Sequence, residues 1–180
     1  PQAGPVHINV PLRDPIYENI QSQIPAFDTK FDIEFKQPSL QNEDIKTIVE
    51  TLKTTPEILF LVGQMNAPEN AFAEALVRVS ELYPVVADIT SNCSTTGIQH
   101  WELALQKGKL NKSHQPKVLI TFGLSVVSKK LKQFLRENKP QKHYHICTGG
   151  SVGDPFFSGP ETIYCEPAEL LRAILDLPIR

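Results

Sequence analysis

One stretch of the sequence, residues 117–132, combines features that suit the binding of a negatively charged small molecule. It reads KVLITFGLSVVSKKLK, in which an apolar run typical of a buried strand breaks at Gly123 and a helical pattern follows. The adjacent Lys129 and Lys130 fall near the start of that helix, where the helix dipole disfavours cations unless an anion compensates. Unpaired N–H groups at a helix start also suit carboxylates and phosphates. Lys129 and Lys130 are therefore candidate anion-binding residues, with two solvated surface lysines as the alternative.

Segments typical of strands and of helices alternate through the chain after about residue 39. The runs expected to form buried strands are residues 58–63, 85–89, 117–122, 143–147 and 162–165. The expected helices cover about 42–54, 68–82, 98–107, the segment that ends near 138, and 168–175. This order predicts an α/β fold: an open, mostly parallel sheet flanked by helices in a Rossmann-like three-layer sandwich. Ligands of such sheets bind beyond the carboxyl ends of the strands.

The first 38 residues are expected to form a separate part of the chain. Residues 5–10 alternate as a strand does, and the sequence from there to Pro38 is rich in Pro, Gln and aromatic residues without a lasting period. We divide the chain into residues 1–38, the end of a preceding domain with a linker, and residues 39–180, an α/β domain. Because the chain begins with Pro1 rather than Met, it is expected to be a piece of a longer protein.

The composition is typical of a soluble globular domain. Of the 180 residues, 41% are hydrophobic and 21% charged. The net charge of −2 offers no electrostatic reason to expect nucleic acid or an anionic membrane as a partner. No apolar run approaches the roughly 20 residues that span a bilayer. Cys93, Cys147 and Cys165 fit neither a metal-binding pair nor a disulfide framework, so we expect reduced thiols and a cytoplasmic protein.

Three other groups of residues could carry chemistry. His143, His145 and Cys147 share one face of a predicted strand and could hold zinc if a fourth ligand arrived from elsewhere, or could simply lie opposite a buried face. The glycine-rich residues 149–154 could cradle an anion, although no helix follows them as the dinucleotide fingerprint requires. Asp88, at the end of a predicted strand, is expected to cap its own loop. No G-x-S-x-G motif is present, and no complete catalytic set emerges.

Several phrases of the sequence resemble, in the same order, those of one enzyme family. They are GPVHINVPLRDPIY at 4–17, LVGQM at 61–65, VVADITS at 85–91 and FGLSVVSKKL at 122–131, where the family has F-G-x-S-x-x-x-K-R-L. The family is the thiamine diphosphate-dependent 2-succinyl-5-enolpyruvyl-6-hydroxy-3-cyclohexene-1-carboxylate synthases of menaquinone biosynthesis. The resemblance covers essentially all 180 residues.

This resemblance implies the tail of the first domain and the whole central domain of a three-domain enzyme. That enzyme decarboxylates 2-oxoglutarate and adds the resulting carbanion equivalent to isochorismate. Thiamine diphosphate and Mg²⁺ would bind to the other two domains, so no cofactor is expected in this fragment, which should be inactive alone. The implied partners are the missing N- and C-terminal domains of the same chain, further copies in a dimer or tetramer, and small-molecule substrates. Neither nucleic acid nor a membrane is among them.

Three residues carry over from the FG motif as substrate-binding positions: Ser125, Lys129 and Lys130. Lys130 stands where the family has arginine, so that a point charge replaces a guanidinium fork. Catalytic residues and metal ligands are not expected in the chain. Two other interpretations stay open: the central domain of another thiamine diphosphate-dependent decarboxylase or carboligase, and a stand-alone nucleotide-binding or regulatory module.

Overall fold

The computed structural model describes residues 7–10, 42–93, 95–150 and 152–177. The chain divides into two units, residues 1–36 and 37–180. In the first unit, residues 7–10 have no regular secondary structure, so the strand predicted over 5–10 is wrong for these four residues. The rest of that strand, the linker up to Pro38 and the side chains of Ser39 and Asn42, which could cap the first helix, lie outside the described residues. The boundary at 38/39 stays a prediction.

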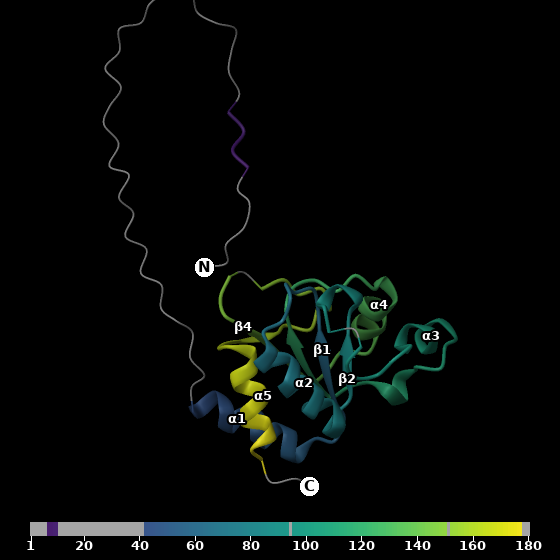
Figure 1. Ribbon diagram of the computed structural model, residues 1–180. Coiled ribbons are helices and arrows are strands. Elements are labelled where there is room, and N and C mark those ends of the chain that lie inside the picture. Colours follow the sequence, from purple (N-terminus) through teal and green to yellow (C-terminus); the bar gives the residue numbers. More distant parts are fainter. Residues whose placement is uncertain (1–6, 11–41, 94, 151, 178–180) are drawn as a thin grey trace, which may run out of the picture. The chain divides into compact units, whose positions relative to one another are not determined.

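The second unit is built on a five-stranded sheet in which every neighbouring pair of strands is parallel (Figure 1). In spatial order the strands are β2 (Val85–Ala87), β1 (Ile58–Val62), β3 (Val118–Phe122), β4 (Lys142–Cys147) and β5 (Glu161–Tyr164). The helices are α1 (Asn42–Thr54), α2 (Asn70–Leu82), α3 (Trp101–Gln106), α4 (Lys129–Glu137) and α5 (Pro167–Leu175). Two short 3₁₀ helices are η1 (Ile89–Ser91) and η2 (Lys112–His114). The predicted Rossmann-like α/β fold is confirmed.

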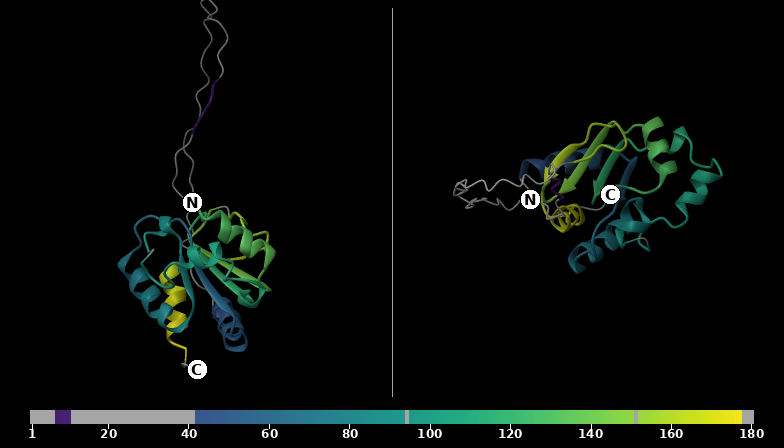
Figure 2. Two further views of the ribbon diagram at one scale, coloured as in Figure 1. Left: turned by 90° about the vertical axis from the view of Figure 1, so that its right-hand side faces the viewer. Right: turned by 90° about the horizontal axis from the view of Figure 1, so that it is seen from above.

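The sheet has a hydrophobic core on each face, because successive side chains of a strand point to opposite faces. Phe60, Ile120 and Tyr144 pack with buried residues of α1, α2 and α5. Leu61 and Leu119 pack instead with Leu131 and Leu135 of α4, and Trp101 of α3 lies against this second core. Figure 2 shows α2 and α5 on one face of the sheet and α4 on the other. The near-continuous apolar strands of the sequence are explained by this double coverage.

The ends of several elements differ from the predicted ones. Helix α2 begins at Asn70, two residues after Pro68, with Glu69 at its N-cap. Strand β2 ends at Ala87 because the backbone turns into η1 after Asp88. Helix α3 is shorter than predicted, since His100 at its N-cap has a φ of 58° and interrupts the helical backbone.

Candidate functional site

The loops after β1 and β3 meet at the carboxyl edge of the sheet. In the strand order β2-β1-β3, chain connections leave β1 and β3 in opposite directions, which normally opens a ligand crevice between them. Backbone hydrogen bonds close this crevice: Gln64 N donates to Ser125 O at 2.9 Å, and Leu124 N donates to Gln64 O at 2.7 Å. A Cβ on Gly63 would collide with the carbonyl oxygen of Leu124. The usual binding crevice of this fold is therefore filled by two interlocked loops.

Asp88 ties the end of β2 to the start of α4. Its side chain is 1% exposed. Oδ1 accepts hydrogen bonds from the backbone N of Thr90 at 3.0 Å and from its Oγ1 at 2.7 Å, while Oδ2 accepts one from Val127 N at 3.0 Å. The predicted capping of its own loop is confirmed, and the bond to Val127 adds a contact across 39 residues of sequence. Asp88 thus fixes the backbone immediately before Lys129.

Helix α4 presents the two candidate lysines at its first two positions. Ser128 caps the helix by accepting a hydrogen bond from Leu131 N at 3.3 Å. Lys129 and Lys130 are both exposed, and neither forms an ion pair with any residue the structure describes. Val127, which precedes the helix, is 58% exposed, whereas Val126 is buried.

Ser125, the third candidate, lies in the exposed turn between β3 and α4. Its hydroxyl makes a long bond of 3.4 Å to the carbonyl oxygen of Val126, while its own carbonyl accepts from Gln64 N. The structure thus brings Ser125, Lys129 and Lys130 to one edge of the sheet, where they stay candidate substrate-binding residues.

A cavity of about 430 Å³ lies beside this helix start. Asp88, Val127 and Ser128 line one side of it, and residues of α3, including Glu102, line the other. Lys129 and Lys130 are not part of its wall. Since its charged side chains are acidic, this cavity is not by itself suited to a dicarboxylate, and the lysines face solvent beside it.

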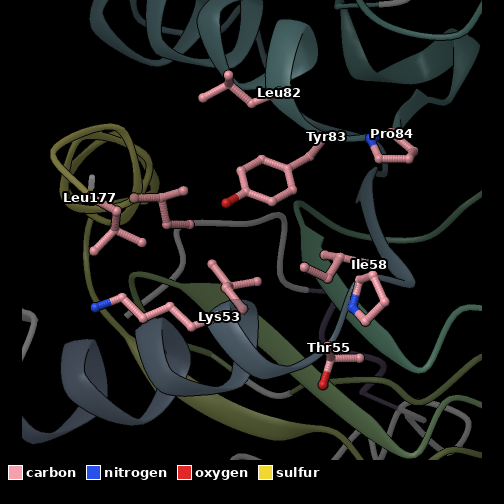
Figure 3. Close-up of a pocket in the computed structure, with 10 residues that line it drawn as sticks. Lys53, Thr55, Ile58, Leu82, Tyr83, Pro84 and Leu177 are labelled. Carbon is pink, nitrogen blue, oxygen red and sulfur yellow. The ribbon is translucent and has the colours of Figure 1, made fainter. Parts of the chain in front are cut away.

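A second cavity, of about 250 Å³, lies at the opposite, amino edge of the sheet. It is enclosed by the C-terminal ends of α1, α2 and α5 and by the start of β1. Figure 3 shows the ring of Tyr83 pointing into it, between Leu82 and Leu177, with Lys53 on the far side. Apolar side chains form most of its wall, and it gathers no set of catalytic groups.

The polar side chains of β4 form a buried hydrogen-bonded chain rather than a metal site. Thr121 Oγ1 lies 2.9 Å from His143 Nε2 and 2.8 Å from His145 Nδ1. His143 Nδ1 lies 2.7 Å from Ser158 Oγ. Thr121 Oγ1 also lies 3.4 Å from the carbonyl oxygen of Tyr144. Because the hydroxyl has a single proton, at least one of the two imidazoles donates to Thr121. Among the described residues, no group of three His, Cys, Asp or Glu side chains is placed to hold a metal.

Burial sets the protonation of this chain. It lowers the pKa of His143 to about 4, against the opposing charge of Asp154, and it also lowers the pKa of His145. Burial by itself would raise the pKa of the Asp154 carboxyl, because it disfavours the charged form. Hydrogen bonds from the backbone of Gly159, Ser158 and Phe156, with the nearby His143, nevertheless lower the pKa of that carboxyl. Immediately after the glycine-rich residues 149–154, backbone N–H groups of Phe156 and Gly159 therefore bind the protein's own carboxylate, that of Asp154.

Acid is expected to destabilise the domain through His143. A pKa depressed to about 4 from an ordinary 6.5 means that the neutral imidazole stabilises the fold above pH 6.5, and that this stability is lost as the pH falls towards 4. The loss should reach roughly 2–3 kcal/mol. Urea denaturation at a series of pH values measures it. The variant His143→Gln should show a shallower pH dependence between 6.5 and 4.5 than the unmodified chain.

The three cysteines are free thiols, as predicted. Cys93 and Cys165 are buried, and Cys147 is half-buried. Burial raises the pKa of the Cys165 thiol to about 12, with added repulsion from nearby acidic groups. Such thiols are unreactive. Within the part of the chain that the structure describes, none of the helices has the length and apolarity that a membrane span needs.

Comparison with known proteins relates almost the whole chain to one enzyme. No family model matches the chain. Over 178 residues it is 28% identical to the 2-succinyl-5-enolpyruvyl-6-hydroxy-3-cyclohexene-1-carboxylate synthase of Bacteroides thetaiotaomicron. This alignment covers 97% of this chain and 32% of that protein. It is 30% identical over 181 residues to the synthase of the same name from Phocaeicola vulgatus, with the same coverage of 97% and 32%. The synthase of Christiangramia forsetii is 32% identical over 155 residues, covering 81% of this chain and 26% of that protein.

The chain is homologous to part of these synthases. It spans about a third of the length of the curated relatives it matches, with 32% of the first two covered. The aligned region includes the segments that hold the interlocked loops, Asp88 and the start of α4, since 97% of the chain is matched. The sequence alone indicated this relationship. The closed crevice and the hydrogen bond from Val127 to Asp88 depend on contacts that no sequence motif predicts.

Proposed function

We propose that the chain is the central domain of a 2-succinyl-5-enolpyruvyl-6-hydroxy-3-cyclohexene-1-carboxylate synthase. In this proposal it holds the neighbouring domains in place and contributes Lys129, Lys130 and Ser125 to a substrate site. The full-length enzyme would decarboxylate 2-oxoglutarate and add the product to isochorismate, assembling as a dimer or tetramer. The observation that carries the proposal is the homology over 97% of the chain to proteins three times its length.

Thiamine diphosphate and Mg²⁺ belong, in this proposal, to the other two domains. The described residues do not offer a fit for either group: metal-binding side chains do not cluster in threes, and the crevice between β1 and β3 is filled. The cofactor would supply the decarboxylation and the carbanion equivalent when bound there. The 180-residue chain by itself should therefore not catalyse the reaction.

The exposed position of the lysines supports their role. Isochorismate is a dicarboxylate. Among the described residues, Lys129 and Lys130 have no acidic partner, so a substrate carboxylate could supply the negative charge that compensates two cations at a helix start. A nucleotide-binding module is less well supported, because the crevice that binds nucleotides in sheets of this order is closed by the bonds of Gln64 to Leu124 and Ser125.

Replacement of Lys129 by alanine in the full-length enzyme is expected to raise the KM for isochorismate about tenfold, which corresponds to about 1.4 kcal/mol. The reason is the loss of one charge-assisted contact to a carboxylate of the substrate. Steady-state kinetics with isochorismate as the varied substrate measures the change. Decarboxylation of 2-oxoglutarate alone should stay near its original rate, since that step precedes the contact.

Lys132→Ala provides the matched control, because it removes the same charge from the next turn of α4. It should leave the KM for isochorismate unchanged. If Lys129→Ala gives the same KM as Lys132→Ala, Lys129 has no part in substrate binding. The assignment of the chain to a synthase is tested separately, by measuring whether the unmodified full-length protein forms product from 2-oxoglutarate and isochorismate.

A further inference from the structure

The basic residues of the chain are unevenly distributed. Between residues 107 and 142 there are ten lysines and arginines and one acidic residue, Glu137, although the whole chain has a net charge of −2. Five of these lysines are exposed and belong to the segments that lead into β3 and β4 at the amino edge of the sheet; these amino-edge lysines are Lys107, Lys109, Lys112, Lys139 and Lys142. The net charge of the whole chain therefore does not reveal this cluster of basic residues.

The two segments that carry the amino-edge lysines run side by side. Gln115 Nε2 donates to the carbonyl oxygen of Lys139 at 2.6 Å, and Lys142 N donates to the carbonyl oxygen of Lys117 at 3.0 Å. Lys117 is neutralised by an ion pair of 2.9 Å with Glu57. Among the described residues the amino-edge lysines themselves form no ion pair. Their charges are therefore free to meet an external anion.

An apolar cavity of about 350 Å³ opens between these segments, α3, α4 and the start of β1. Leu110, Ser113 and Gln115 line it, so the chain that carries Lys109 and Lys112 forms part of its wall. Its other walls include Trp101 and Phe134, both only half-buried. Covering such surfaces gains roughly 25 cal/mol for each Å² removed from water.

We propose that this cavity and the amino-edge lysines form a docking site for an acidic amphipathic segment of a partner protein. Large apolar side chains of the segment fill the cavity, and its carboxylates meet the amino-edge lysines, of which Lys109 and Lys112 adjoin residues of the cavity wall. A concave apolar centre with a charged rim is the usual anatomy of a protein interface. Nucleic acid would instead need a basic surface that follows a run of phosphates. The amino-edge lysines lie at the edge of the sheet opposite Lys129 and Lys130, and the proposal does not rest on the proposed function. Trp101 lines both this cavity and the one beside the start of α4.

Trp101 allows a direct test, because it is the only tryptophan of the chain and lines the cavity. The 180-residue chain is titrated with a synthetic, tryptophan-free peptide that places leucine on one face of a helix and glutamate on the other. Saturable binding should change the emission of Trp101 and weaken when salt is raised from about 0.05 to 0.3 M. Peptides with serine for leucine, or lysine for glutamate, should bind at least tenfold more weakly. Absence of binding by the first peptide would overturn the proposal.

Charge reversal locates the site. The double variant Lys109→Glu/Lys112→Glu should weaken binding of a labelled peptide, followed by fluorescence anisotropy, at least tenfold. The control Lys46→Glu/Lys53→Glu makes the same charge change on exposed positions of α1 and should bind normally. Equal binding by the two double variants contradicts the proposal. So does tighter binding of a single-stranded oligonucleotide or of a simple fatty-acid anion, since either result would assign the surface to a different class of ligand.

Discussion

Replacement of Gly63 by alanine is expected to lower the free energy of unfolding by about 2–4 kcal/mol. The added methyl group would collide with the carbonyl oxygen of Leu124 and would lie 3.2 Å from that of Ser125. Both contacts are with backbone that is hydrogen-bonded to Gln64, so neither can move without breaking the bonds that join the loops after β1 and β3. Urea denaturation, with an unchanged slope and a lower midpoint, measures the loss.

Alanine substitutions at two other glycines of the same domain serve as controls that distinguish the cost of a steric collision from the cost of backbone strain. Gly108 has a φ of 63° but nothing within 4 Å of an added Cβ, so Gly108→Ala should cost only about 1 kcal/mol. Gly153 has neither constraint, and Gly153→Ala should stay within about 0.5 kcal/mol of the unmodified chain. A cost for Gly63→Ala no larger than that for Gly108→Ala would mean that the two loops are not locked together.

Hydrophobic periodicity was sufficient to predict the fold. The apolar runs at 58–63 and 117–122 became adjacent parallel strands, because an uninterrupted apolar strand is stable only when helices cover both of its faces. The helix expected over about 42–54 likewise became α1, whose Ile48 and Leu52 are buried in the first core. Where a polar residue interrupted the pattern, as at Asp88, the strand ended earlier than its apolar letters indicated.

The site was harder to predict because its main contacts join residues far apart in the sequence. The capping role of Asp88 follows from its place at a strand end, but its bond to Val127 requires the three-dimensional arrangement of β2 and α4. The closing of the crevice depends on backbone atoms of Gln64 and Leu124, which carry no side-chain signature. In the same way, the spacing of His143 and His145 allowed a metal site, and only the position of Thr121 between the rings shows what they bind.

Removal of the Asp88 carboxylate should loosen the start of α4 and, through it, the position of Lys129. Asp88→Ala leaves the N–H groups of Thr90 and Val127 without an acceptor in a site that is 1% exposed, so the free energy of unfolding should fall by about 3 kcal/mol. Asp88→Asn, which keeps the shape but replaces one acceptor with a donor, should cost about 2 kcal/mol. Urea denaturation gives both values, and amide hydrogen exchange at Val127 should become faster in each variant.

Thr90→Val is the control for Asp88, because it removes one donor to Oδ1 and leaves the bond to Val127 intact. It should cost about 1 kcal/mol and leave hydrogen exchange at Val127 unchanged. If the proposed role of Lys129 holds, Asp88→Asn in the full-length enzyme should also raise the KM for isochorismate, and combining it with Lys129→Ala should add little further, since both act on one contact. Additive effects would show that Asp88 stabilises the fold without positioning Lys129. An unchanged exchange rate at Val127 in Asp88→Asn would contradict the link between β2 and α4 itself.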